Sequence, residues 1–122
     1  MLVEDDLELH PVLVDFLSDY RVLLASSGEE ALDILKKEKL KIDLVLCDYN
    51  MEEWNGIETI KKLRKISPHT RFILMSGSEP DVLPLLASKV NADAWLSKPF
   101  SEEALLGKIE TIFKENHFEA VK

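Results

Sequence analysis

The chain has 122 residues, of which 46% are hydrophobic and 31% are charged, and its formal net charge is -8 at pH 7. This composition is typical of one globular domain that buries its core without disulfides or structural metals, and the negative charge argues against direct binding to nucleic acid or to anionic membranes. The sequence contains neither an apolar stretch of about 18 residues nor a secretory signal pattern, so we expect a cytoplasmic protein that does not enter a membrane.

Five short apolar runs alternate with stretches in which apolar residues recur with helical spacing. The runs have the length of buried strands and comprise residues 2–3, 22–25, 42–47, 72–75 and 94–96. The helical stretches cover residues 9–17, 31–35, 57–63, 82–86 and 105–113. Alternating strands and helices predict an α/β fold, a doubly wound five-stranded parallel sheet with helices on both faces.

Local signals mark the ends of several predicted helices. Ser27, Ser78 and Ser101 can each cap the start of a helix, because their hydroxyl groups accept hydrogen bonds from N–H groups of the first turn. Asn91 is placed to end the fourth helix in a left-handed turn. Pro84 lies inside the same stretch and predicts that this helix starts late or is kinked.

Three single residues are interpreted from their neighbours. Cys47, the lone cysteine, lies inside an apolar run, and we interpret it as a small buried core residue rather than a redox group. Gly56 is expected to be a loop glycine that needs a positive φ. Trp54 either caps the third helix from its loop or contacts a partner, and the sequence leaves both possibilities open.

Charged and polar side chains follow the predicted strands. Glu4 and Asp5 follow the first run, Asp48 the third, Ser76 the fourth and Lys98 the fifth. In open parallel sheets the functional crevice lies beyond the carboxyl ends of the strands, so we expect these side chains to meet there. Clustered carboxylates raise one another's pKa unless a cation lies between them. The pattern therefore predicts a site for Mg²⁺, or Mn²⁺ in its place, that also handles phosphoryl groups.

Five segments occur in an order and spacing that together cover nearly the whole chain: residues 2–6, 31–51, 55–58, 73–77 and 92–100. In this arrangement the chain resembles the response-regulator receiver domain of two-component signal transduction, of the chemotaxis-regulator type. The resemblance implies a flavodoxin-like (βα)5 fold with strand order 2-1-3-4-5. We expect this domain to span residues 1–115, and residues 116–122 to form a tail or the stump of a linker.

The resemblance assigns roles to the acidic residues. It implies that Asp48 is the phosphoacceptor, which takes a phosphoryl group from a sensor histidine kinase or a phosphotransfer protein. Asp5 would be a direct metal ligand, and Glu4 would bind the metal through water. Asp48 and the main-chain carbonyl of Asn50 would complete the protein's ligands to the metal.

The resemblance also implies how a signal leaves the site. Ser76 would move to bind the phosphoryl group, and Lys98, followed by a cis bond to Pro99, would pair with it. Trp95 occupies the position of a switch aromatic that is commonly tyrosine or phenylalanine. It either responds to Ser76, stays outward as an interface anchor, or packs in the core.

The output face implied by the resemblance comprises the fourth helix, the fifth strand and the fifth helix. This face would control an output domain or target protein, with a phosphorylation-dependent dimer as one possibility. Pro84 leads us to expect that the fourth helix is mobile and shifts on phosphorylation. Glu52 replaces a proline that is common in the family and, with Glu53 beside it, makes the loop over the site acidic, so we expect kinase recognition or phosphate lifetime to change. Asn50 and Ser78 match two positions that tune autodephosphorylation in the family.

Two other functions compete with a phosphoaccepting receiver. A degenerate receiver would bind partners without phosphorylation, which the complete set of charged site residues argues against. A phosphatase of similar fold would need a general acid beside Asp48, where Asn50 stands instead. We therefore expect a signalling domain that catalyses only its own phosphorylation and autodephosphorylation.

Overall fold

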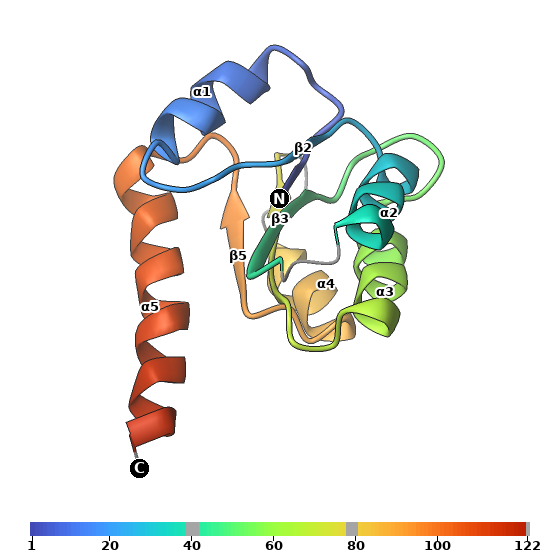
Figure 1. Cartoon of the computed structure of the whole chain (residues 1–122). Helices are drawn as coiled ribbons and strands as arrows, with labels where there is room; N and C mark the ends of the chain where they lie inside the picture. Colours follow the sequence, from blue (N-terminus) through green and yellow to red (C-terminus); the bar gives the residue numbers. More distant parts are fainter. Residues whose placement is uncertain (39–41, 78–80, 122) are drawn as a thin grey trace.

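The computed structural model describes residues 1–38, 42–77 and 81–121, in which strands and helices alternate along the chain (Figure 1). The strands are β1 (Leu2–Val3), β2 (Leu24–Ala25), β3 (Leu44–Asp48), β4 (Arg71–Ser76) and β5 (Ala94–Ser97). The helices are α1 (Leu9–Phe16), α2 (Gly28–Lys37), α3 (Gly56–Ile66), α4 (Leu83–Lys89) and α5 (Glu102–Val121).

The strands form one parallel sheet in the order β2-β1-β3-β4-β5, which confirms the predicted fold class. One expected strand is shorter than its apolar run, because β2 holds only Leu24 and Ala25 of residues 22–25. The reason is the length of its neighbour: β1 offers only Leu2 and Val3 as partners, and these pair with Leu24 and Ala25.

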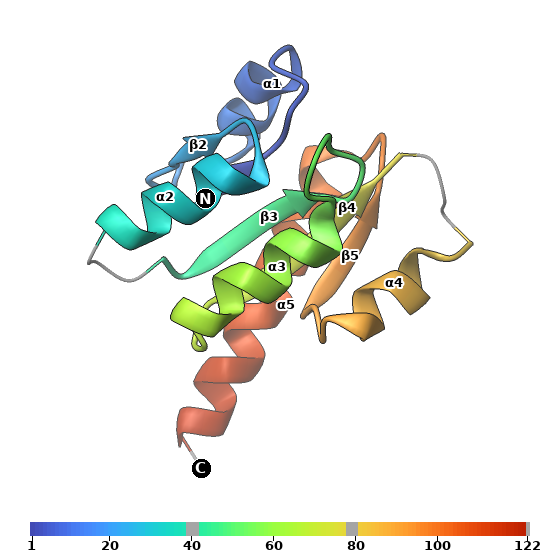
Figure 2. The same ribbon diagram turned by 90° about the vertical axis from the view of Figure 1, so that its right-hand side faces the viewer.

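Each face of the sheet has its own hydrophobic core. Helices α1 and α5 lie on one side, and α2, α3 and α4 lie on the other (Figures 1 and 2). Along β3, Leu46 packs toward α1 and α5, whereas Val45 and Cys47 pack toward the three-helix side, as the alternation of side chains in a strand requires. Cys47 is fully buried, which confirms its predicted core role, and burial raises the pKa of its thiol.

Two of the predicted N-terminal caps are present. The Ser27 hydroxyl accepts a hydrogen bond from the N–H of Glu30 at 3.1 Å, and the Ser101 hydroxyl accepts one from Ala104 at 3.0 Å. Each bond satisfies an N–H group that the first turn of a helix would otherwise leave unpaired. The third predicted cap, Ser78, lies outside the described residues.

Helix α4 has the late start and the left-handed end predicted for it. Pro84 is its second residue, where a missing N–H disturbs no helical hydrogen bond. At the other end Asn91 has a φ of 49°, and the N–H of Ala92 donates to the Ala87 carbonyl oxygen at 2.9 Å. This pattern closes the helix as a left-handed cap does.

A side chain of α3 holds the same end of α4. The Arg64 guanidinium donates to the carbonyl oxygen of Val90 and, at 3.2 Å, to that of Asn91. It also lies over the Phe72 ring, 4.9 Å from the centroid. These contacts tie the C-terminal end of α4 to α3 and β4.

Helix α5 continues to Val121, so residues expected to form a polar tail are helical as far as that residue. The predicted domain boundary after residue 115 stays a prediction. The inner face of the helix packs on the sheet through Leu105, Ile109 and Ile112. Within the described ranges, no helix combines the length and the apolar character that crossing a membrane requires.

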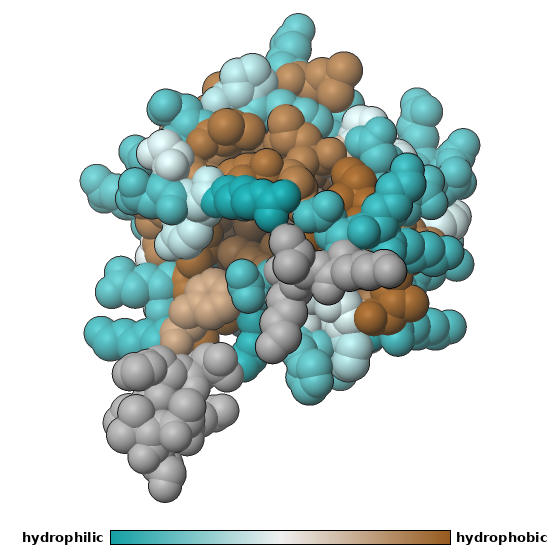
Figure 3. Space-filling view, in the orientation of Figure 1, coloured by the Kyte–Doolittle hydropathy of each residue, from teal (hydrophilic) through white to brown (hydrophobic). Residues whose placement is uncertain are grey.

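A cavity of about 480 Å³ lies where the strands begin, at the opposite end of the sheet from Asp48. Its wall includes Met1, Leu17, Leu44 and Phe113. Apolar surface gathers on this side of the domain in Figure 3, around the place where Figure 1 marks the N-terminus. None of the predicted site residues lines this cavity.

Candidate functional site

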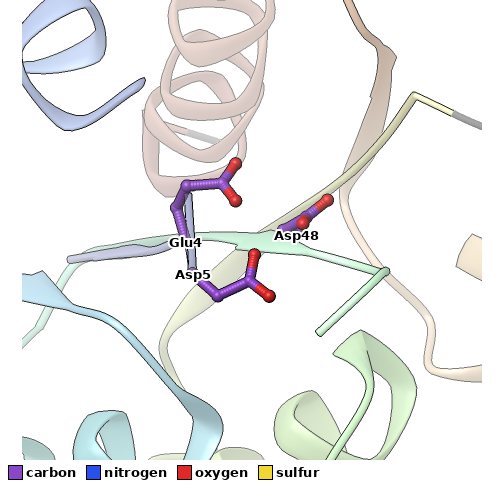
Figure 4. A group of neighbouring side chains, drawn as sticks. All are labelled: Glu4, Asp5 and Asp48. Atoms are coloured by element: carbon purple, nitrogen blue, oxygen red, sulfur yellow. The ribbon is translucent and has the colours of Figure 1, made fainter. Parts of the chain in front are cut away.

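Three carboxylates meet at the carboxyl ends of β1 and β3. These strands are parallel neighbours in which Val3 pairs with Cys47, so Glu4 and Asp48, the next residues, lie side by side. One carboxylate oxygen from each of Glu4, Asp5 and Asp48 lies within 4.8 Å of the other two. Figure 4 shows the three carboxylates gathered at the ends of the two strands. The cluster predicted from the sequence is therefore present.

Lys98 brings a positive charge to this cluster from the end of β5. Its Nζ contacts the Glu4 carboxylate and lies 3.2 Å from Asp48 Oδ1. Its backbone N–H donates to the carbonyl oxygen of Ser76 at 2.8 Å, and Ser76 itself is fully buried at the end of β4. The bond between Lys98 and Pro99 is cis, as expected.

Burial and mutual repulsion shape the protonation of the site. Burial, reinforced by the Glu4 charge and opposed by Lys98, raises the pKa of Asp48 to about 6. Partial desolvation and the neighbouring Glu4 also raise the pKa of the Asp5 carboxyl, although Asp5 is exposed. Burial alone would lower the pKa of Lys98, but the two carboxylates outweigh it and raise this pKa. The site thus places three carboxyl groups beside one ammonium group.

The donor set fits a small divalent cation. Carboxylate oxygens are the ligands that Mg²⁺ and Mn²⁺ prefer, and the three converging carboxylates carry more negative charge than Lys98 alone neutralises. Asn50, the fourth predicted ligand, is exposed in the loop that follows β3. The role of its carbonyl oxygen stays a prediction.

Hydrogen bonds within the β1–α1 loop fix the backbone around the acidic residues. The Asp6 N–H donates to Glu4 Oε2 at 3.2 Å, and the Glu8 N–H donates to Asp6 Oδ1 at 3.0 Å. His10 Nε2 lies 2.7 Å from the carbonyl oxygen of Glu4. This contact could not be predicted from the sequence, because no spacing rule links a residue of the first helical turn to a carbonyl six positions earlier.

Gly56 supports the site in a way that differs from the prediction. Its φ is not positive, so the expectation of a loop glycine in the left-handed region is wrong. Gly56 is the first residue of α3, and an added Cβ would lie 2.7 Å from the Asp48 carbonyl oxygen and 2.9 Å from Leu74 Cδ1. The glycine is required here because the helix starts in close contact with the backbone of the acidic residue.

Trp54 and its surroundings favour one of its two interpretations. The ring is half-buried, and Lys62 Nζ of α3 lies 4.7 Å from its centroid. On the other side, a Cβ on Gly28 of α2 would lie 3.0 Å from Trp54 Cε3. Trp54 therefore packs between the first residue of α2 and Lys62 of α3, which favours its interpretation as a cap over the third helix.

Trp95 faces outward from β5. Its side chain is 40% exposed, and Lys108 Nζ of α5 lies 5.6 Å from the ring centroid. This exposure contradicts the interpretation as a core residue, because the alternation of β5 turns Ala94 and Leu96 inward instead. A switch aromatic in its outward position and an interface anchor both remain compatible with the geometry.

The chain has clear relatives among proteins of known kind. The family model of the response regulator receiver domain matches residues 1–110. The transcriptional regulatory protein CpxR of Escherichia coli is 35% identical over 120 residues, which are 97% of this chain and 50% of that protein. The alkaline phosphatase synthesis transcriptional regulatory protein PhoP of Bacillus subtilis is 30% identical over 98% of this chain and 50% of its own length. The chain thus spans about half the length of these relatives.

Solved structures agree with the sequence comparisons. A CheY-like receiver domain protein from Methanospirillum hungatei has a TM-score of 0.85 and 26% identity, and the match covers 97% of this chain and 94% of that one. The BeF3-activated DrrB receiver domain has a TM-score of 0.79 and 25% identity over 93% of this chain and 94% of that one. Fold, site geometry and family match lead to one conclusion: this chain belongs to the response regulator receiver domains of two-component signalling.

Proposed function

We propose that this receiver domain takes a phosphoryl group onto Asp48 from a sensor histidine kinase or a phosphotransfer protein. The observation that carries the proposal is the position of Asp48, whose carboxylate is nearly buried between two other carboxylates and the Lys98 ammonium. This arrangement pairs an anionic nucleophile with an ammonium group that can neutralise charge on a phosphoryl group and with carboxylates that can bind a divalent cation.

The chemistry asked of Asp48 is a displacement at phosphorus. One carboxylate oxygen forms a bond to phosphorus while the bond from phosphorus to the donor's nitrogen breaks, and the electron pair of that bond leaves with the donor. The pKa of about 6 leaves Asp48 ionised at pH 7 and able to act as the nucleophile. Negative charge develops on the phosphoryl oxygens during transfer, and Lys98 is close enough to Asp48 to stabilise it.

A divalent cation would complete the site. We assign Asp5, Asp48 and the Asn50 carbonyl as its direct ligands and Glu4 as a ligand through water, with Mg²⁺ or Mn²⁺ as the ion. When bound, the ion would supply positive charge to the phosphoryl oxygens. The closeness of the Glu4, Asp5 and Asp48 carboxylate oxygens, all within 4.8 Å of one another, supports this assignment.

Phosphorylation would change the contacts of Lys98 and Ser76. Lys98 now contacts Glu4 and Asp48, and a phosphoryl group on Asp48 would draw its ammonium and the Ser76 hydroxyl toward itself. This shift would bias Trp95 and the face made by α4, β5 and α5 toward a second state. That face would then bind an output domain or a target protein, or a second phosphorylated copy.

Acetyl phosphate with Mg²⁺ tests the proposal directly. We expect intact-protein mass spectrometry to detect one phosphoryl adduct, and we expect Asp48→Ala to abolish it. Asp19→Asn changes an exposed acidic residue in the turn after α1; it is the matched control and should keep the adduct. No adduct on the unchanged chain would indicate a module that only binds partners, and repeated turnover of foreign phosphoesters would indicate a phosphatase.

A further inference from the structure

The imidazole of His10 binds the main chain at the edge of the acidic cluster. His10 is the second residue of α1 and is half-buried. Its Nε2 lies 2.7 Å from the carbonyl oxygen of Glu4. Because a carbonyl oxygen can only accept a hydrogen bond, Nε2 carries the proton and donates. The bond ties the first turn of α1 to the end of β1.

The Glu4 carbonyl needs this donor because the ladder between β1 and β2 ends beside it. The Glu4 N–H still donates to Ala25, the last residue of β2, at 3.0 Å. In a parallel ladder, the N–H and C=O of one residue point to the same neighbouring strand. The Glu4 C=O therefore points past the end of β2. Glu4 is fully buried, so a carbonyl without a donor would be costly there.

Holding the Glu4 oxygen also holds the backbone of Asp5. The Glu4 carbonyl and the Asp5 nitrogen belong to one peptide group, and this group is planar. Fixing its oxygen fixes the plane from which the Asp5 Cα and side chain project. Asp5 is exposed, so few packing contacts constrain the direction of its side chain, and the orientation of this peptide plane becomes correspondingly important.

We propose that His10 is a positioning residue for the divalent-cation site, which directs the Asp5 carboxylate toward Asp48 by holding the Glu4–Asp5 peptide group. This role rests on the proposed function, because it needs the metal site to exist. His10 touches no reacting atom, so its role is not catalytic. Removal of a group that orients metal ligands typically weakens metal binding by about 10–100-fold.

The experiment measures Mg²⁺ affinity and stability separately. His10→Phe keeps a ring without a donor, whereas His10→Gln offers an amide N–H at a similar distance from the backbone. His69→Phe makes the same chemical change at an exposed histidine in the turn before β4 and serves as the control. Each protein is titrated with Mg²⁺ by calorimetry at constant pH and unfolded in urea without metal. His10→Asn, whose amide is too short to reach the Glu4 carbonyl, is a second variant without this bond if His10→Phe does not fold.

We expect His10→Phe to raise the Kd for Mg²⁺ by about 10-fold, His10→Gln to stay within about 3-fold of the unchanged chain, and His69→Phe to leave it unchanged. A merely structural His10 would shift the urea midpoint and leave the Kd alone. That result, or equal weakening by Phe and Gln, overturns the proposal. An unchanged chain that binds no Mg²⁺ overturns the proposed metal site as well, so the two failures are distinguishable.

Discussion

The Lys98 ammonium lies 3.2 Å from the Asp48 carboxylate, although β4 separates the strands that carry these two residues. The Lys98 side chain can reach across β4 because Lys98 follows the end of β5, where its backbone N–H is hydrogen-bonded to the Ser76 carbonyl oxygen at the end of β4. The same ammonium contacts Glu4 beyond β1. One side chain thus links the ends of three strands, and a phosphoryl group on Asp48 would compete for it.

Removing the Lys98 charge should cost both stability and reactivity. In Lys98→Met, the buried Glu4 and Asp48 carboxylates would face each other without a cation. We expect the metal-free variant to lose about 3 kcal/mol of the free energy of unfolding in urea, and its phosphorylation by acetyl phosphate to slow by about 100-fold or more. Lys98→Arg keeps the charge and should keep most of the stability. A methionine variant as stable as the unchanged chain would contradict this prediction.

Because the pKa of Asp48 is raised, replacing this carboxylate by a neutral amide should increase the free energy of unfolding in a pH-dependent way. Burial and Glu4 raise this pKa from 3.8 to about 6, so the folded state disfavours the ionised form. The resulting loss in the free energy of unfolding is absent below pH 4, grows as the pH rises toward 6, and is complete above 6. Without Mg²⁺, we expect Asp48→Asn to be more stable than the unchanged chain by about 1–3 kcal/mol at pH 7 and equally stable near pH 4.

Urea unfolding at both pH values checks this expectation, with Asp19→Asn as the control at an exposed site. The control should show no such gain at either pH. The prediction fails if Asp48→Asn is less stable than the unchanged chain at pH 7. In the presence of Mg²⁺ the difference should shrink, because a bound cation would stabilise the ionised carboxylate that the variant lacks.

Two glycines in helices should respond oppositely to alanine. A Cβ at Gly56 would lie 2.7 Å from the Asp48 carbonyl oxygen, whereas nothing lies within 4 Å of a Cβ at Gly107. We expect Gly56→Ala to cost about 1–3 kcal/mol of unfolding free energy and to slow phosphorylation. Gly107→Ala should add about 0.5–1 kcal/mol and leave phosphorylation unchanged. Thermal unfolding and adduct formation measure both, and equal effects would refute the role of close packing at Gly56.

Fluorescence quenching can decide between the two remaining interpretations of Trp95. In Trp54→Phe, Trp95 is the sole tryptophan, and its 40% exposure predicts efficient quenching by acrylamide. A switch aromatic should become less accessible when beryllofluoride and Mg²⁺ are added, and Asp48→Asn should abolish that change. Quenching that stays the same in both proteins would identify Trp95 as an outward anchor instead.

The sequence predicted the site best where strand pairing determines it. Glu4 and Asp48 follow strands that the fold makes parallel neighbours, so their meeting follows from the end points of two apolar runs. The positions of Ser76 and Lys98 follow in the same way from the ends of β4 and β5, which are also parallel neighbours. Asp5 joined them because it is adjacent to Glu4. These contacts depend on topology, and the alternation of strands and helices carries that information.

The features that escaped prediction depend on how the backbone passes through the loops. The bond from His10 to Glu4 requires a particular path of the β1–α1 loop, and the need for Gly56 comes from the closeness of α3 to the Asp48 backbone rather than from its own φ. Neither is encoded in periodicity or composition. The shortened β2 has a similar origin, since the length of a strand depends on its partner as well as on its own residues.

The bonds from Arg64 to Val90 and Asn91 give α4 a fixed point at one end. A rearrangement that keeps these hydrogen bonds would change the angle of the helix about its C-terminal end rather than shift the helix along its axis. The arc would then be widest at Leu83 and smallest at Lys89. Under the proposed function, a partner that binds α4 would detect phosphorylation of Asp48 as a change in the angle of this helix, which turns about its contact with α3.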